Sequence, residues 1–426
     1  PRIDSEATTD RGNRFPSGST DGPVRDRGGN VGRSPHDRWI GPLARGMAFV
    51  LLVALAGCSS SDDPSADDPA TEEPTTDAST AVDQASLDQP GAFGVGRSTV
   101  TVVDEAREGR SLTTDVWYPI EPDAGAEPSI YQLVPRAPGF DHQIAKADEP
   151  LADDGPFPLL VFSHGSPSVR WQSLFVMELL ASHGFVVVAP DHAGDSAVDA
   201  LAGDLAAPAE NEVNRPTDVS FMIDAVLAGE VAEPTGLADA VDPERIGIIG
   251  HSVGGATVLT AAGGLRDLPP DDRIDAVLAW TPFALGVPDE SLAAIDVPTM
   301  VIGADRDDIA PTEPNVERVW DTVPGRPLYR ADLRRGGHDQ FGIVCDLLAA
   351  ADANPDFPTD LRPLIDIPAQ DACTPEFLPI DEAHTLIARY SLAFALAHVA
   401  GNDQAVAWLQ SAEAASASDL SVNVKE

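Results

Sequence analysis

The fold class of this 426-residue chain is indicated most clearly by the stretch Arg245-Ile-Gly-Ile-Ile-Gly250-His-Ser252-Val-Gly254. The run Ala256-Thr-Val-Leu-Thr-Ala-Ala262 follows it. The apolar beginning of the stretch is typical of a short strand buried on both faces, and the later run is compatible with a helix. Between them, the Gly-x-Ser-x-Gly pattern predicts a sharp turn that holds the Ser252 hydroxyl out at the end of a sheet as a nucleophile. The alternative is an ordinary glycine-rich turn between a strand and a helix.

Outward from this stretch, strand patterns alternate with helix patterns along most of the chain. Strands are predicted at 98–103, 112–118, 158–162, 185–189, 245–249, 276–280, 299–302 and 327–333, and helices at 172–183 and 216–229. The segment 121–157 is rich in Pro, Gly and Asp, which predicts a long loop. This alternation predicts an α/β fold with a mainly parallel central sheet covered by helices on both faces. Functional groups of such folds lie at the carboxyl ends of the strands.

A serine hydroxyl needs a base, and a group that orients the base, before it can act as a nucleophile. After a Gly-x-Ser-x-Gly turn, the acid is expected next in the chain and the histidine last. The loop after the strand at 299–302 offers three acids, Asp305, Asp307 and Asp308. Spacing alone does not choose among them.

Three histidines follow that loop. His338 comes directly after the last predicted strand, and the glycines before it permit a tight turn toward Ser252. His384 and His398 lie on helical stretches, where a structural role is expected. The pattern therefore favours His338 as the base.

An oxyanion that forms at the serine needs backbone N–H donors aimed at it. One donor is expected from Val253, the residue after the nucleophile. The second is expected from Ser166, in the loop 163–166 after the strand at 158–162, where His164 would hold the loop. This chemistry needs no metal and no organic cofactor. The three cysteines form no Cys-x-x-Cys pattern, so a cysteine-rich zinc site is not expected either.

The N-terminal part predicts export rather than a fold. An apolar core at 47–57 follows Arg38 and Arg45, as in a secretory signal, and Leu55-Ala-Gly-Cys58 resembles the lipobox of bacterial lipoproteins, in which the cysteine is lipidated. The alternative is a buried helix of a small N-terminal domain. Residues 58–90 carry acids but no Lys or Arg, which predicts a disordered linker. The expected organisation is an upstream segment with signal peptide at 1–57, this linker, a catalytic domain at 91–411 and a tail at 412–426.

The net charge of −42 excludes nucleic acid and anionic bilayers as electrostatic partners, because both would be repelled. The longest apolar run has about a dozen residues, which is below the ~18 needed to span a bilayer, so a multi-pass membrane protein is excluded. If Cys58 is lipidated and the chain exported, Cys345 and Cys373 are left to form a disulfide around 346–372. The alternative is two buried free thiols.

Together these residues resemble the α/β-hydrolases, over roughly Gly91 to Leu409. Within that superfamily, Val161-Phe-Ser-His-Gly165 and Gly250-His-Ser-Val-Gly-Gly-Ala-Thr257 are similar to the platelet-activating-factor acetylhydrolase group. Val116-Trp-Tyr-Pro119 is similar to bacterial proteins labelled predicted dienelactone hydrolases.

The stretch from Val297 to Pro311 resembles the cutinase-like polyesterases, which include poly(ethylene terephthalate) (PET) hydrolases. The triad acid of that motif corresponds to Asp307. The resemblance implies an exported serine hydrolase that cleaves carboxylic esters, either small acyl esters or polyesters, through Ser252, Asp307 and His338. Two other functions stay open: an acyltransferase that passes the acyl group to an alcohol, and a non-catalytic binding lipoprotein.

Overall fold

The computed structural model describes residues 82–122, 125–140, 142 and 144–426. The chain divides into two units, 1–75 and 76–426, and every described residue belongs to the second. The predicted upstream segment with signal peptide at 1–57, the lipidation site Cys58 and most of the linker at 58–90 lie outside the described residues.

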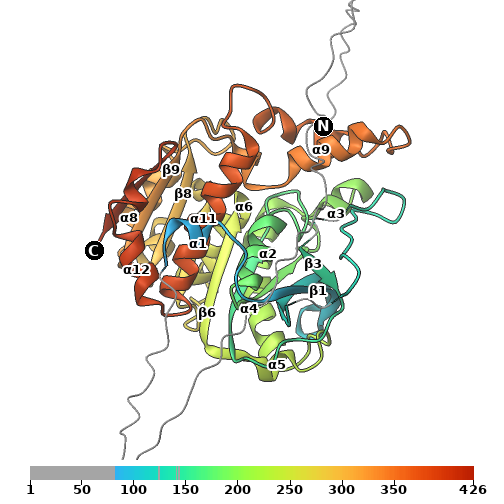
Figure 1. The fold of residues 1–426 in the computed structure, drawn as a ribbon, viewed down its shortest axis with the longest axis horizontal. Coiled ribbons are helices and arrows are strands. Elements are labelled where there is room, and N and C mark those ends of the chain that lie inside the picture. Colours follow the sequence, from blue (N-terminus) through green and yellow to red (C-terminus); the bar gives the residue numbers. More distant parts are fainter. Residues whose placement is uncertain (1–81, 123–124, 141, 143) are drawn as a thin grey trace, which may run out of the picture. The chain divides into compact units, whose positions relative to one another are not determined.

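A ten-stranded sheet forms the centre of the described part (Figure 1). Its strands are β1 (Gly94–Asp104), β2 (Arg110–Ile120), β3 (Ala145–Ala147), β4 (Phe157–Ser163), β5 (Val186–Pro190), β6 (Val241–His251), β7 (Ala276–Trp280), β8 (Thr299–Ala304), β9 (Leu328–Leu333) and β10 (Leu420–Lys425). They lie in the order β10-β9-β8-β7-β6-β4-β5-β2-β1-β3. Strands β5, β4, β6, β7, β8 and β9 are parallel neighbours, while β1, β2 and β10 pair antiparallel. The predicted mainly parallel sheet is confirmed.

Helices cover the sheet. The longer elements are α2 (Leu174–Ser182), α4 (Pro208–Leu227), α6 (Val253–Gly263), α8 (Val316–Thr322), α9 (Val344–Ala353), α11 (Ile380–His398) and α12 (Asp403–Leu409). The shorter ones are α1 (Gln84–Leu87), η1 (Glu105–Arg107), α3 (Ala197–Ala202), α5 (Leu237–Ala240), η2 (Ala284–Gly286), α7 (Asp289–Ala294), η3 (His338–Phe341), α10 (Pro363–Asp366), η4 (Pro368–Asp371) and η5 (Ala414–Ser416).

Two hydrophobic cores lie on the two faces of the sheet. On β5, Val186 and Val188 belong to the core that contains α4 and α6, whereas Val187 and Ala189 belong to the core that contains α2 and α11. Successive side chains of a strand point to opposite faces. A run without polar residues, such as β5, therefore fits only a strand that is covered on both sides.

The structure corrects four expectations from the sequence. Residues 420–425 are not part of a tail but pair with β9 as an edge strand. Within the predicted linker, Gln84–Leu87 forms a helix whose Leu87 is buried. The predicted loop at 121–157 contains β3, and α4 begins at Pro208, eight residues before the predicted start, with Pro216 inside it. In the first case Leu420, Val422 and Val424 alternate with polar residues as in a strand, a pattern that the expected tail overlooked. In the second case burial of Leu87 stabilises a short segment whose own sequence is too polar to predict structure.

No helix of the described residues is long and apolar enough to cross a bilayer.

Candidate active site

The candidate nucleophile lies on the turn between β6 and α6. Ser252 has φ 58° and ψ −120°, a conformation that residues other than glycine rarely adopt and that costs on the order of 1–3 kcal/mol. A Cβ at Gly250 would come within 2.1 Å of the Gly254 carbonyl oxygen, and one at Gly254 within 2.0 Å of the Ser163 carbonyl oxygen. The two glycines of the motif therefore permit the close backbone approach on which the turn depends.

The structure brings the predicted serine, acid and histidine together. His338 Nε2 lies 2.8 Å from Ser252 Oγ, and His338 Nδ1 lies 2.7 Å from Asp307 Oδ2. All three side chains are buried. They follow β6, β8 and β9, whose carboxyl ends meet at one edge of the sheet. The hydrogen-bond order is that of a general base held between a nucleophile and an acid.

Only one of the three candidate acids reaches the histidine. Asp307 Oδ1 accepts hydrogen bonds from the backbone N–H groups of Ile309 (2.9 Å) and Ala310 (2.6 Å), which leaves Oδ2 for His338. Asp305 and Asp308 are exposed on the same loop. The choice that spacing left open is thus made by the direction in which each side chain points.

The charges around His338 favour its protonated form. Burial lowers the pKa of His338, but the hydrogen bond and negative charge of Asp307, with smaller contributions from Asp339 and Asp371, raise it above its ordinary value of 6.5. Burial raises the pKa of Asp339 to about 6, against the opposing charge of His338. An imidazolium formed at His338 would be stabilised by this field, as general-base catalysis requires.

The two predicted oxyanion donors flank the nucleophile. Among the described residues, neither Ser166 N–H nor Val253 N–H donates to a protein acceptor. The loop that carries Ser166 lies against the turn, because a Cβ at Gly165 would be 3.6 Å from Ser252 Cβ. Unpaired N–H groups beside a nucleophile can stabilise negative charge that develops on a bound carbonyl oxygen.

Two residues of the site were missed by the sequence analysis. Gln172 accepts the Gly165 N–H at 2.8 Å and donates to His251 Nδ1 at 2.7 Å. His251 Nε2 then donates to the carbonyl oxygen of His338 at 2.9 Å. Burial, with the nearby His338, holds the pKa of His251 well below its ordinary value, so the ring is neutral. The place of His251 inside the Gly-x-Ser-x-Gly motif was the one available signal, whereas nothing in the sequence marks Gln172.

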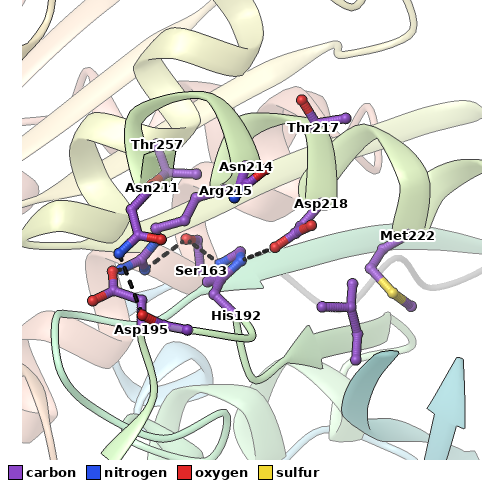
Figure 2. A network of polar contacts seen from close by, with 12 residues as sticks. Ser163, His192, Asp195, Asn211, Asn214, Arg215, Thr217, Asp218, Met222 and Thr257 are labelled. Carbon is purple, nitrogen blue, oxygen red and sulfur yellow. Dashed lines mark hydrogen bonds and ion pairs between the residues drawn. The ribbon is translucent and has the colours of Figure 1, made fainter. Parts of the chain in front are cut away.

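A buried network of hydrogen bonds and ion pairs holds the loop 163–166 in place (Figure 2). Ser163 Oγ lies 2.9 Å from His192 Nε2, and His192 Nδ1 lies 2.9 Å from Asp218. Arg215 contacts Ser163 and the His164 carbonyl oxygen and pairs with Asp195, which also accepts the Ser166 hydroxyl at 2.6 Å.

The Ser163–His192–Asp218 order repeats that of the site at Ser252, but all three side chains are fully shielded from solvent. Burial, together with the charge of Arg215, lowers the pKa of His192 to about 4. No substrate carbonyl could reach Ser163, so this second group supports the loop structurally.

Ser252 and His338 open onto a cavity of about 280 Å³. Most of its wall is apolar, and the larger side chains are Tyr131, Leu133, Phe140, Val169, Trp171, Ile309, Ile343, Leu347, Phe357, Leu364 and Ile365. Asp339 is the one acid among the described residues of the wall, which contains no Lys or Arg. In the described part of the chain, no group of three or more His, Cys, Asp or Glu side chains could hold a metal ion.

Comparison with known proteins fits this geometry. A family model described as PET hydrolase-like matches residues 160–343. The chain resembles the α/β-hydrolase serine esterases of the cutinase and PET hydrolase group. Its predicted α/β-hydrolase fold is confirmed. The match contains Ser166, Ser252, Val253, Asp307 and His338.

Individual relatives of this group are distant. Cutinase est1 of Thermobifida alba is 27% identical over 39% of this chain and 47% of its own length. Cutinase 1 of Thermobifida cellulosilytica is 27% identical over 41% of this chain and 55% of its own length. Platelet-activating factor acetylhydrolase of Canis lupus familiaris is 28% identical over 38% of this chain and 43% of its own length. The chain thus spans about half the length of these relatives.

Cys345 and Cys373 form a disulfide bond. It joins the start of α9 to the residues after η4 and so closes a loop just beyond His338.

Proposed function

We propose that this protein is a serine hydrolase that cleaves carboxylic esters by way of an acyl-enzyme. The proposal rests on the hydrogen-bonded series Asp307–His338–Ser252, which opens onto an apolar cavity beside two unpaired backbone N–H groups. The similarity to cutinases and to an acetylhydrolase supports the same reaction class.

In the first half of the reaction, Ser252 Oγ attacks the ester carbonyl carbon while His338 Nε2 takes the hydroxyl proton. Asp307 accepts a hydrogen bond from Nδ1–H and so keeps Nε2 free to act as the base. The carbonyl oxygen becomes an oxyanion that the N–H groups of Val253 and Ser166 stabilise. When the tetrahedral adduct collapses, His338 returns the proton to the leaving alcohol, and the acyl group stays on Ser252.

In the second half, a water molecule takes the place of the alcohol. His338 removes a proton from this water as it attacks the acyl carbon, and then protonates Ser252 as the carboxylic acid leaves. The cycle balances without any other reactant, because His338 serves in turn as base and acid.

Ser252→Ala tests this proposal. The variant is expected to lose at least four orders of magnitude in the rate of p-nitrophenyl butyrate hydrolysis, since members of a catalytic triad act as a unit. A fluorophosphonate probe should label the wild type and not the variant. Ser421→Ala on β10, at the far edge of the sheet, is the control and should keep full activity. If Ser252→Ala kept more than about a hundredth of the wild-type rate, Ser252 would not be the nucleophile.

We also propose that the chain is exported and anchored through a lipid on Cys58. The pattern at 47–58 supports this, as does the disulfide Cys345–Cys373, since disulfides persist mainly in oxidising compartments outside the cytosol.

A further inference from the structure

The segment 344–373, here called the cap, forms part of the cavity wall and has helices, a disulfide and an apolar core of its own. It contains α9, α10 and η4, and the disulfide Cys345–Cys373 joins its two ends. It has a small apolar core of its own, formed by Val344, Ala351, Ile365, Ala369 and Ala372. In Figure 1 the cap is the orange excursion around α9, outside the layers of sheet and helices.

Hydrogen bonds connect the cap to His338 and to Gln340 on η3. Asp371 on η4 accepts a hydrogen bond from the backbone N–H of His338. Gln340, two residues further along η3, donates to the carbonyl oxygen of Ala372 in the cap (3.1 Å) and to that of Leu378 (2.6 Å), five residues beyond the end of the cap. These bonds hold the cap in one position over the site at the end where it returns to the body of the protein.

Two walls of different origin meet at the cavity. The cap contributes Val344, Leu347, Phe357, Leu364, Ile365 and Pro368, and the segment 131–140 contributes Tyr131, Leu133, Ala137, Pro138 and Phe140. The two walls also touch through an ion pair between Arg136 and Asp360, whose atoms are 2.6 and 2.8 Å apart. Neither wall belongs to the part matched by the PET hydrolase-like model, which begins at 160 and ends at 343.

The size and charge of the cavity limit what it can hold. About 280 Å³ lies just below the ~300–1,000 Å³ usual for ligand pockets, so the cavity suits a small group. A polymer chain that runs past the serine on both sides of the cleaved bond needs an open groove, and here the exposed ion pair between Arg136 and Asp360 links the two walls. Among the described residues of the wall, Asp339 has a carboxyl group and none is Lys or Arg, which disfavours a substrate that carries its own carboxylate.

We propose that the cap, together with the segment 131–140, makes this site selective for small, uncharged esters of apolar acids and excludes polyesters. The inference rests on the proposed ester hydrolase function and specifies its substrate class. Leu347 on the cavity side of α9 is a specificity-determining residue in this proposal.

The experiment compares Leu347→Ala with Leu348→Ala in the full-length protein. Both side chains are half-buried and adjacent on α9, but Leu347 lines the cavity, whereas Leu348 packs only in the small core of the cap. kcat/KM is measured on p-nitrophenyl esters from acetate to decanoate, and release of soluble products from PET film is measured alongside.

The wild type is expected to prefer short acyl chains and to release no measurable product from the film. Leu347→Ala should raise the ratio of kcat/KM for octanoate to that for butyrate at least tenfold, because each methylene group accommodated in an apolar pocket contributes about fourfold. Leu348→Ala should leave this ratio within twofold of the wild type.

Each other outcome has a distinct meaning. Measurable release of product from the film by the wild type, above that of Ser252→Ala, would overturn the cap proposal while leaving the esterase proposal in place. A ratio in Leu347→Ala within twofold of the wild type would overturn it as well. Equal shifts of the ratio in both leucine variants would also overturn it, since the effect would then come from general loosening of α9. If the wild type hydrolysed no ester of the series, the proposed function itself would fail.

Discussion

Replacing Asp307 by Asn removes one charge and leaves the shape of the site intact. Two backbone N–H groups, those of Ile309 and Ala310, donate to Oδ1 of Asp307. The amide of an Asn at this position is therefore fixed with its oxygen toward these donors and its NH2 group toward His338. His338 Nδ1, which donates to the carboxylate in the wild type, must then accept, so its proton moves to Nε2. A protonated Nε2 in neutral His338 has no lone pair for the hydroxyl proton of Ser252.

The expected loss in kcat for Asp307→Asn is about 10⁴, the size usual when a triad histidine is held in the wrong tautomer. At ~1.36 kcal/mol for each factor of ten, this corresponds to about 5 kcal/mol of transition-state stabilisation. Because the bonds from Ile309 and Ala310 persist, the free energy of unfolding should change by only about 1 kcal/mol. Thermal unfolding therefore separates loss of catalysis from loss of the fold.

The assay is hydrolysis of p-nitrophenyl butyrate under single-turnover and steady-state conditions. Asp305→Asn and Asp308→Asn are matched controls, because both side chains are exposed on the same loop and each change removes the same charge. Both controls should stay within about threefold of the wild type, as expected for exposed charges outside the site. A loss of less than tenfold in Asp307→Asn, or an equal loss in Asp308→Asn, would show that Asp307 does not set the tautomer of His338.

Three further predictions concern pH, the disulfide and the anchor. His338 must be neutral to act as a base, and its pKa is raised above 6.5. We therefore expect kcat/KM to decrease on acidification with an apparent pKa above 6.5. Asp307→Asn should move this decrease to lower pH, which a pH profile of both proteins would measure. The disulfide Cys345–Cys373 closes a loop of 28 residues, so its reduction should lower the free energy of unfolding by about 3–4 kcal/mol and Tm by on the order of 5 °C. A thermal unfolding curve that does not change with reductant would contradict this. Cys58→Ser should move the protein from the membrane fraction to the soluble fraction with unchanged kcat, and equal membrane association would contradict the anchor.

Much of the fold and of the candidate site could be read from local patterns. The buried strands at 158–162, 185–189 and 276–280 were recognised because a strand covered on both faces has no polar positions. Ser252 was predicted because the strained turn requires a residue without a side chain at positions 250 and 254, and both are glycines. His338 followed from its position directly after a strand.

Two further elements, one at each end of the described chain, were not predicted. The tail at 412–426 contains β10, whose partner β9 lies about ninety residues earlier, and the helix at 84–87 is held by burial of Leu87 and an ion pair between Asp88 and Arg389. The segment 84–87 is too short and polar to predict its own structure. The segment 420–425 does carry the alternation of a strand, with Leu420, Val422 and Val424 on one face, but its pairing with β9 appears only in the folded chain.

The strands and the serine turn could be predicted from the sequence because each is marked by a pattern within a few residues. The parallel sheet followed from the alternation of strands and helices, and the order of serine, acid and histidine from the fold that this motif indicates. The folded structure was needed to show which of three aspartates faces His338 and that Gln172 and His251 support the site. It was also needed to show that residues 344–373 form part of the cavity wall. These outcomes depend on the directions of side chains brought together from distant strands. Packing and hydrogen bonding can distinguish such equivalent residues only after the chain has folded.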